Sequence, residues 1–209
     1  MYLVNHLRFM MFMKVFALTL ALFSLSSQAA LIRADFRTES NLPDYGSGQP
    51  LVYQSLNQTV GAGYELDSAD FVQNPDGWYG GVVWVDYDPA SAIITLWSQD
   101  YWDFQTFDVW ISNIQFDVAG ETIANVVLLS DNLIEEAIAP VVSITSNSLH
   151  IAYDYRPDTF LFSGGMARFK MESREGDITQ PLVNVPEPLT ALIMLVGLFV
   201  IGRQQYGIK

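Results

Sequence analysis

The sequence predicts an all-β fold: an antiparallel β-sandwich or jelly-roll-like ectodomain, with an N-terminal signal helix and a single C-terminal transmembrane helix. Three observations predict it: short runs of alternating apolar and polar residues, turn residues between those runs, and an apolar segment near each end of the 209-residue chain. In residues 148–155, for example, Leu, Ile and Tyr alternate with Ser, His, Ala and Asp, which is the period of a half-buried strand. Short, regularly spaced strands are typical of sandwiches and jelly rolls.

The ectodomain is expected to span residues 31–173. Its first part, residues 31–50, is rich in Gly, Ser and Pro and is expected to form an irregular strand or loop. Turn residues such as Asn74-Pro75-Asp76-Gly77 separate the later runs. Strands are then expected near residues 51–59, 63–73, 80–87, 92–98, 106–118, 122–130, 141–146, 148–155, 159–163 and 166–173.

Residues 1–30 have the pattern of a secretory signal peptide. Lys14 precedes the apolar run 15–25, and small residues lead up to Ala29 and Ala30, after either of which a signal peptidase would cleave. Met13 and Lys14 together make a conventional start of such a signal, so we expect Met13 to be the natural first residue.

The composition of the ectodomain excludes several classes of function. The chain carries 23 Asp and Glu but 10 Lys and Arg, and no Lys or Arg occurs between Thr38 and Tyr155. Nucleic acid is therefore not an expected partner, because phosphate binding needs basic side chains. The chain has no cysteine, which excludes thiol catalysis and thiolate metal sites.

The C-terminal part of the chain is a linker, residues 174–184, followed by residues 185–209, an apolar segment with a proline-rich start and a basic residue after it. The extended box Val185, Pro186, Glu187 and Pro188 precedes a helix expected over residues 189–202, and the basic Arg203 follows it. Proline and glutamate suit a helix N-terminus. The length fits either a marginal membrane span or a terminal helix packed on the domain, and its position at the end of the chain favours the membrane.

These residues resemble the PEP-CTERM sorting domain, which ends many exported proteins of Gram-negative bacteria. The resemblance covers the Val-Pro-Glu-Pro box, the apolar run and the basic residue after it. It implies passage through the inner membrane with the ectodomain in the periplasm, and a transpeptidase-like sorting enzyme acting near Pro186-Glu187-Pro188. It also implies a final place on the outer surface or in the extracellular matrix, often alongside exopolysaccharide. The resemblance concerns a route and not an activity.

One aromatic segment of the ectodomain is a candidate contact surface for a glycan or another partner. Trp97, Tyr101 and Trp102 are interleaved with Asp100 and Asp103 around an expected turn. Aromatic faces stack on sugar rings, and carboxylates accept hydrogen bonds from sugar hydroxyls. The alternative is that these aromatic side chains fill the core.

Metal binding and catalysis have weaker signals. Calcium prefers oxygen ligands, and Asp86 with Asp88, or Asp100 with Asp103, offer them, although Asp88 also suits a turn joining two strands. No other cofactor is expected. His150, the single histidine of the ectodomain, lies mid-strand, and no catalytic motif accompanies it. We therefore expect a non-enzymatic envelope or matrix protein; the alternative is a secreted carbohydrate-active enzyme on a jelly-roll scaffold.

Export and sorting predict the mass of the mature protein. Isolated from its host, the protein should begin after Ala29 or Ala30 and end near Pro186–Pro188, because both terminal segments are then removed. Intact-mass spectrometry of membrane and extracellular fractions checks this. A full-length, membrane-bound species as the sole product contradicts it.

Overall fold

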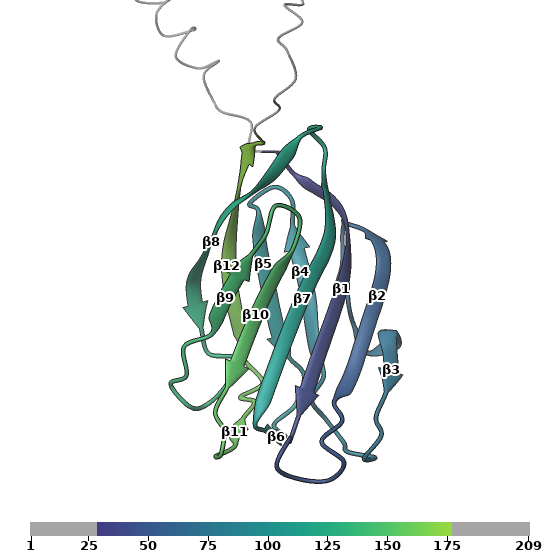
Figure 1. The fold of residues 1–209 in the computed structure, drawn as a ribbon, viewed down its shortest axis with the longest axis vertical. Coiled ribbons are helices and arrows are strands. Elements are labelled where there is room, and N and C mark those ends of the chain that lie inside the picture. Colours follow the sequence, from purple (N-terminus) through teal and green to yellow (C-terminus); the bar gives the residue numbers. More distant parts are fainter. Residues whose placement is uncertain (1–28, 177–209) are drawn as a thin grey trace, which may run out of the picture. The chain divides into compact units, whose positions relative to one another are not determined.

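The computed structural model describes residues 29–176, which form an all-β domain of antiparallel sheets (Figure 1). One sheet has six strands in the order β3 (Phe71–Gln73), β2 (Leu51–Thr59), β1 (Leu31–Asn41), β7 (Thr106–Phe116), β10 (Leu149–Asp154) and β9 (Val141–Ile144). The second has four, in the order β4 (Val83–Asp88), β5 (Ile93–Ser98), β12 (Met166–Glu175) and β8 (Glu121–Asp131). A short pair, β6 (Asp103–Phe104) with β11 (Phe160–Leu161), completes the fold.

The two larger sheets share one apolar core. Alternate residues of the central strands point inward, so β4 buries Val83, Val85 and Tyr87, and β7 buries Phe107 and Val109. These side chains belong to a single cluster of buried residues from both sheets. Burial of one such side chain contributes roughly 1.5–3 kcal/mol. The all-β, antiparallel class expected from alternation is therefore confirmed.

The irregular strand or loop expected at residues 31–50 is a strand with irregular pairing followed by a loop over residues 42–50. Residues 31–41 form β1, which pairs with β2 on one side and with β7 on the other. Its inward positions include Thr38 and Ser40, both 1% exposed, so the strand lacks the apolar alternation that marks the others. The Ser40 hydroxyl is satisfied inside the domain, because it donates to the carbonyl oxygen of Gly81 at 2.9 Å.

The strand expected over residues 63–73 is mostly absent. Only β3 forms there, preceded by a 3₁₀ turn, Ser68–Asp70. The Asp67 carboxylate accepts from the N–H of Ala69 at 2.7 Å, and the Asp70 carboxylate accepts from the N–H of Asp67 at 2.9 Å. These local bonds compete with strand pairing. The other expected strands lie within a few residues of their observed positions, and β12 continues to Glu175, past the expected end at residue 173.

The described chain begins and ends at the same end of the domain. β1 starts and β12 finishes there, whereas β6 and β11 lie at the opposite end (Figure 1). Most of the expected signal segment, the helix expected at 189–202 and the sorting box lie outside the described residues. Within residues 29–176, no helix is long and apolar enough to cross a membrane.

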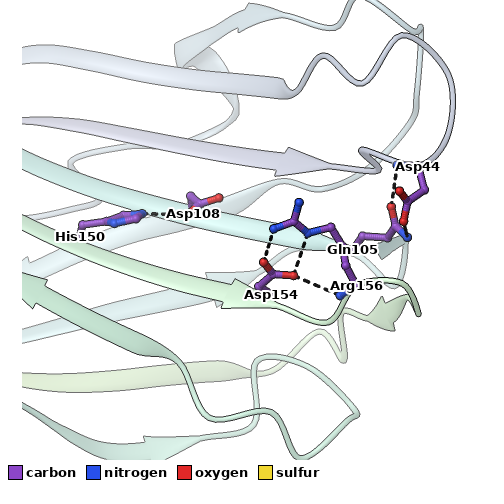
Figure 2. A network of polar contacts seen from close by, with 6 residues as sticks. All are labelled: Asp44, Gln105, Asp108, His150, Asp154 and Arg156. Atoms are coloured by element: carbon purple, nitrogen blue, oxygen red, sulfur yellow. Dashed lines mark hydrogen bonds and ion pairs between the residues drawn. The ribbon is translucent and has the colours of Figure 1, made fainter.

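Gln105, between β6 and β7, joins two loops at the end of the domain that carries β6 and β11. Its side chain is completely buried. Its amide nitrogen donates to the Asp44 carboxylate at 2.7 Å, and its amide oxygen accepts from the N–H of Asp44 at 2.9 Å (Figure 2). The amide nitrogen also donates to the Pro157 carbonyl at 2.8 Å. One side chain therefore satisfies three polar groups of two different loops.

Replacing Gln105 with leucine should lower the free energy of unfolding by about 2–4 kcal/mol, because the N–H of Asp44 and the carbonyl of Pro157 lose their partner. The matched control is Gln115→Leu, at an exposed position of β7, which should change it by less than about 0.5 kcal/mol. Urea denaturation of both variants measures the difference. Equal effects would contradict this role of Gln105.

Candidate functional site: aromatic surfaces at one end of the domain

Three strongly exposed aromatic side chains gather on two loops at the end of the domain that carries β6 and β11. Tyr79 lies in the loop before β4, and Tyr101 and Trp102 lie in the loop between β5 and β6. They are 77%, 66% and 50% exposed, respectively. The rings of Tyr79 and Trp102 contact each other, with centroids 6.4 Å apart and planes tilted by 37°. We call Tyr79, Tyr101 and Trp102 the loop-end aromatic surface.

Two glycines pack directly against the rings of Trp102 and Tyr101. A Cβ at Gly80 would lie 1.7 Å from Cδ1 of Trp102, and one at Gly164 would lie 2.8 Å from the hydroxyl oxygen of Tyr101. Both glycines have positive φ, 83° and 66°, which other residues rarely adopt. The indole and the phenol therefore rest directly on glycine backbone. This backing supports each ring from the protein side while it stays exposed to solvent.

The two carboxylates expected beside these rings have different environments. Asp100 shapes the loop, because its carboxylate accepts from the N–H of Val82 at 3.1 Å and from the N–H of Trp102 at 3.3 Å. Asp103 begins β6 and is exposed, where it can accept from a ligand. The arrangement therefore combines supported rings with one accessible carboxylate.

Trp97, expected on the same surface, packs with a different set of rings. It lies on the outer face of the second sheet, opposite Trp84 of β4 in the strand register. The Trp84 and Trp97 rings are 5.8 Å apart, and the ring of Tyr64 is 4.6 Å from Trp84 and 6.1 Å from Trp97. We call Tyr64, Trp84 and Trp97 the sheet-face aromatic cluster.

The two aromatic sets are neighbours in the fold. Gly164, the seat of Tyr101, is followed by Gly165, whose carbonyl accepts from the N–H of Ser98 at 3.0 Å. The next residue, Met166, is the register partner of Trp97. Sequence reasoning missed Tyr64, Tyr79 and Trp84. Outward alternation in β4 could have indicated Trp84, but the two tyrosines lie in loops without a local signal.

A buried carboxylate fixes the loop that carries Tyr64. Glu65 is only 2% exposed, and its carboxylate accepts from the N–H of Tyr87 at 2.7 Å and from the N–H of Gly61 at 3.2 Å. Burial raises the pKa of this carboxyl to about 7, although the two N–H groups act in the opposite direction. Glu65 thereby attaches the Tyr64 loop to β4.

The outer face of the six-stranded sheet carries a separate polar network (Figure 2). Nε2 of His150 lies 2.7 Å from the Asp108 carboxylate, and the imidazole stacks on Trp110 at 4.7 Å with planes 4° apart. Burial raises the pKa of Asp108, and the bond to His150 partly opposes this. Nearby, Arg156 pairs with Asp154. His150 is thus mid-strand on a polar face, as its sequence position predicts.

Two of the four carboxylates considered for calcium, those of Asp88 and Asp100, are bound within the protein. Asp88 accepts from the N–H of Ala90 at 2.9 Å and from the Ser91 hydroxyl at 2.5 Å, which is the turn that the sequence also allowed. Asp100 is bound to the backbone as described above. Across residues 29–176, no group of three or more His, Asp or Glu side chains is arranged to hold a metal ion.

Comparison of the chain with protein-family models, with curated proteins and with solved structures gives no significant match.

The raised pKa of Glu65 predicts a pH-dependent stability. The native state retains a proton that the unfolded chain releases between pH 4.5 and about 7, so the free energy of unfolding should fall as the pH rises through that window and level off above it. The fall due to Glu65 is roughly 3–4 kcal/mol at 1.36 kcal/mol per pKa unit.

Urea denaturation at pH 4.5, 5.5, 6.5 and 7.5 measures this dependence. Glu65→Gln should remove the part of the fall in unfolding free energy that is due to Glu65. The contributions of Asp86 and Asp108, whose pKa values are also raised, stay in both proteins. Parallel pH profiles for the two proteins would show that Glu65 does not titrate in this window.

Proposed function

We propose that the chain is an exported, non-enzymatic component of the cell envelope or extracellular matrix that binds exopolysaccharide through its loop-end aromatic surface. A signal peptide and a C-terminal sorting segment with a membrane helix deliver it by the route that the PEP-CTERM resemblance implies. The observation that carries the binding role is the exposure of Tyr79, Tyr101 and Trp102, two of them seated on glycine backbone.

The chemistry of the surface favours a neutral glycan. Exposed ring faces stack on the apolar faces of sugars, and Asp103 can accept hydrogen bonds from hydroxyl groups. No Lys or Arg occurs between residues 38 and 155, a stretch that includes every residue of this surface. An anionic polysaccharide would therefore meet repulsion without compensating cations.

The position of the surface supports the same role. The loops that carry it lie beside β6, at the end of the domain opposite to the start of β1 and the finish of β12 (Figure 1). The chain continues toward the sorting segment from the finish of β12. The aromatic side chains are therefore far from Glu175, the last residue of β12, and stay accessible when a partner contacts that end of the domain.

The start of the described chain favours one of the two cleavage sites. The N–H of Ala30 donates to the Asp117 carboxylate at 2.8 Å. Cleavage after Ala29 would turn this group into the terminal ammonium and strengthen the bond, since charge-assisted hydrogen bonds exceed neutral ones. Cleavage after Ala30 would remove the group.

A second candidate, a secreted carbohydrate-active enzyme, has one observation in its favour. Glu39 of β1 and Asp108 of β7 are register partners. The Cβ atoms of directly opposite residues lie about 4.5–5.5 Å apart. Arg37 pairs with Glu39, whereas burial raises the pKa of Asp108. Retaining glycosidases use two carboxyl groups about 5–5.5 Å apart, and one of the two has a raised pKa.

Binding of the mature protein to exopolysaccharide purified from its own host tests the first proposal. Trp102→Ala should weaken retention in affinity electrophoresis by about tenfold or more, equivalent to ~1.4 kcal/mol. The matched control is Phe71→Ala, an aromatic residue of β3 that is 53% exposed, which should leave retention unchanged. Equal retention of both variants would reject the loop-end aromatic surface.

Release of reducing sugar separates the two candidates. The binding protein should release none from the same polysaccharide. Turnover that disappears in Asp108→Asn and in Glu39→Gln, while Trp102→Ala keeps its folded melting profile, would establish the enzyme instead.

A further inference from the structure

The outer face of the four-stranded sheet has a row of aromatic side chains next to a row of polar ones. Trp84 of β4 and Trp97 of β5 are register partners. Two residues further along, Asp86 is the partner of Thr95, which is also the partner of Arg168 on β12. Because residues two apart on a strand share a face, these polar side chains border the sheet-face aromatic cluster.

Arg168 is a cation without a partner in the domain. Its chain neighbours Ala167 and Phe169 are buried, so its own side chain points outward, and it is exposed. Within residues 29–176, its guanidinium makes no hydrogen bond or ion pair, whereas every other basic side chain except that of Arg174 binds a protein oxygen. A free guanidinium suits a carboxylate, which it binds with parallel hydrogen bonds.

The aromatic cluster is within reach of this guanidinium. Trp97 and Arg168 are diagonal neighbours on one face, because Trp97 is opposite Met166 and Arg168 is opposite Thr95. Diagonal neighbours lie about 7–8 Å apart. Tyr64 and Trp97 are 38% and 36% exposed, respectively. A sugar ring stacked on Trp97 would therefore hold a substituent close to the guanidinium of Arg168.

Asp86 lies at the other end of the polar row. One strand separates it from Arg168, so their backbones are roughly 9.5 Å apart at about 4.8 Å per strand. Burial raises the pKa of Tyr64, and the Asp86 carboxylate raises it further, which is consistent with a carboxylate close to the rings. An ionised carboxylate accepts hydrogen bonds from hydroxyl groups but repels a second carboxylate. The two ends of the row thus favour one orientation of an acidic sugar.

We propose that the sheet-face aromatic cluster and Arg168 form a second carbohydrate subsite, which takes a sugar residue carrying a carboxylate. The sugar ring stacks on Trp97, the guanidinium of Arg168 binds the carboxylate, and Asp86 accepts hydrogen bonds from hydroxyl groups. Charge complementarity with Arg168 distinguishes this occupant from a neutral sugar. The inference rests on the proposed glycan-binding function and adds the chemical class of one sugar residue. The loop-end aromatic surface, which has no cation, takes neutral residues of the same polysaccharide.

Methyl glucuronide and methyl glucoside test the proposal, because the first carries a carboxylate where the second carries a hydroxymethyl group. Titrated into the full-length chain, the glucuronide should shift the NMR signal of the Trp97 indole N–H, which is assigned by its loss in Trp97→Phe. It should also bind about tenfold more tightly than the glucoside. Equal affinity for the two sugars, or an unchanged Trp97 signal, would overturn the proposal.

Two arginine variants separate a local contact from the general effect of charge. Arg168→Gln should abolish the preference for the glucuronide, whereas Arg174→Gln should retain it. Arg174 is the matched control, because it is also exposed and unpaired on β12 within the described residues and its replacement changes the net charge equally. The same loss of preference in both variants would count against the subsite. Affinity electrophoresis of Trp102→Ala reports on the loop-end aromatic surface alone, so failure of the proposed function is distinguished from failure of this subsite.

Discussion

Carboxylates accept hydrogen bonds from backbone N–H groups in many loops of this domain, and the loop conformations depend on these bonds. With more than twice as many acidic as basic residues, the chain cannot pair most carboxylates with cations. The side chains that bind N–H groups instead include Asp35, Glu65, Asp76, Asp88, Asp100, Asp117, Asp131 and Glu136. Such charge-assisted bonds are stronger than neutral ones, and they satisfy donors that would otherwise be costly to bury. Acidity and loop order therefore have one physical basis here.

The proposed binding surface depends on the same interaction. Asp100 holds the turn that exposes Tyr101 and Trp102, and Gln105 attaches the loop of Asp44 to the start of β7. The rings are thus presented by ordered loops on a two-sheet scaffold, which reduces the conformational entropy lost on binding.

Much of the fold could be predicted because the alternation of a strand is local. β2 and β10 were expected close to their observed bounds for this reason. The bounds of β1 were not predicted, because two of its inward positions carry Thr38 and Ser40. A strand paired on both sides tolerates such residues when a partner such as the Gly81 carbonyl is available. The partner is distant in the sequence, so no local pattern reveals it.

The sequence by itself determined the all-β class, the acidity of the domain, and the exposed turn with Tyr101 and Trp102, since each depends on composition or on neighbouring residues. Only the tertiary structure decided how the aromatic residues are grouped. Strand register placed Trp97 opposite Trp84, and glycines of two separate loops pack against Tyr101 and Trp102. The raised pKa of Glu65 and the contact between β8 and β9, which belong to different sheets, were likewise decided by folding. Burial and strand register depend on contacts between residues far apart in the chain, and no local pattern in the sequence predicts which of these residues come into contact.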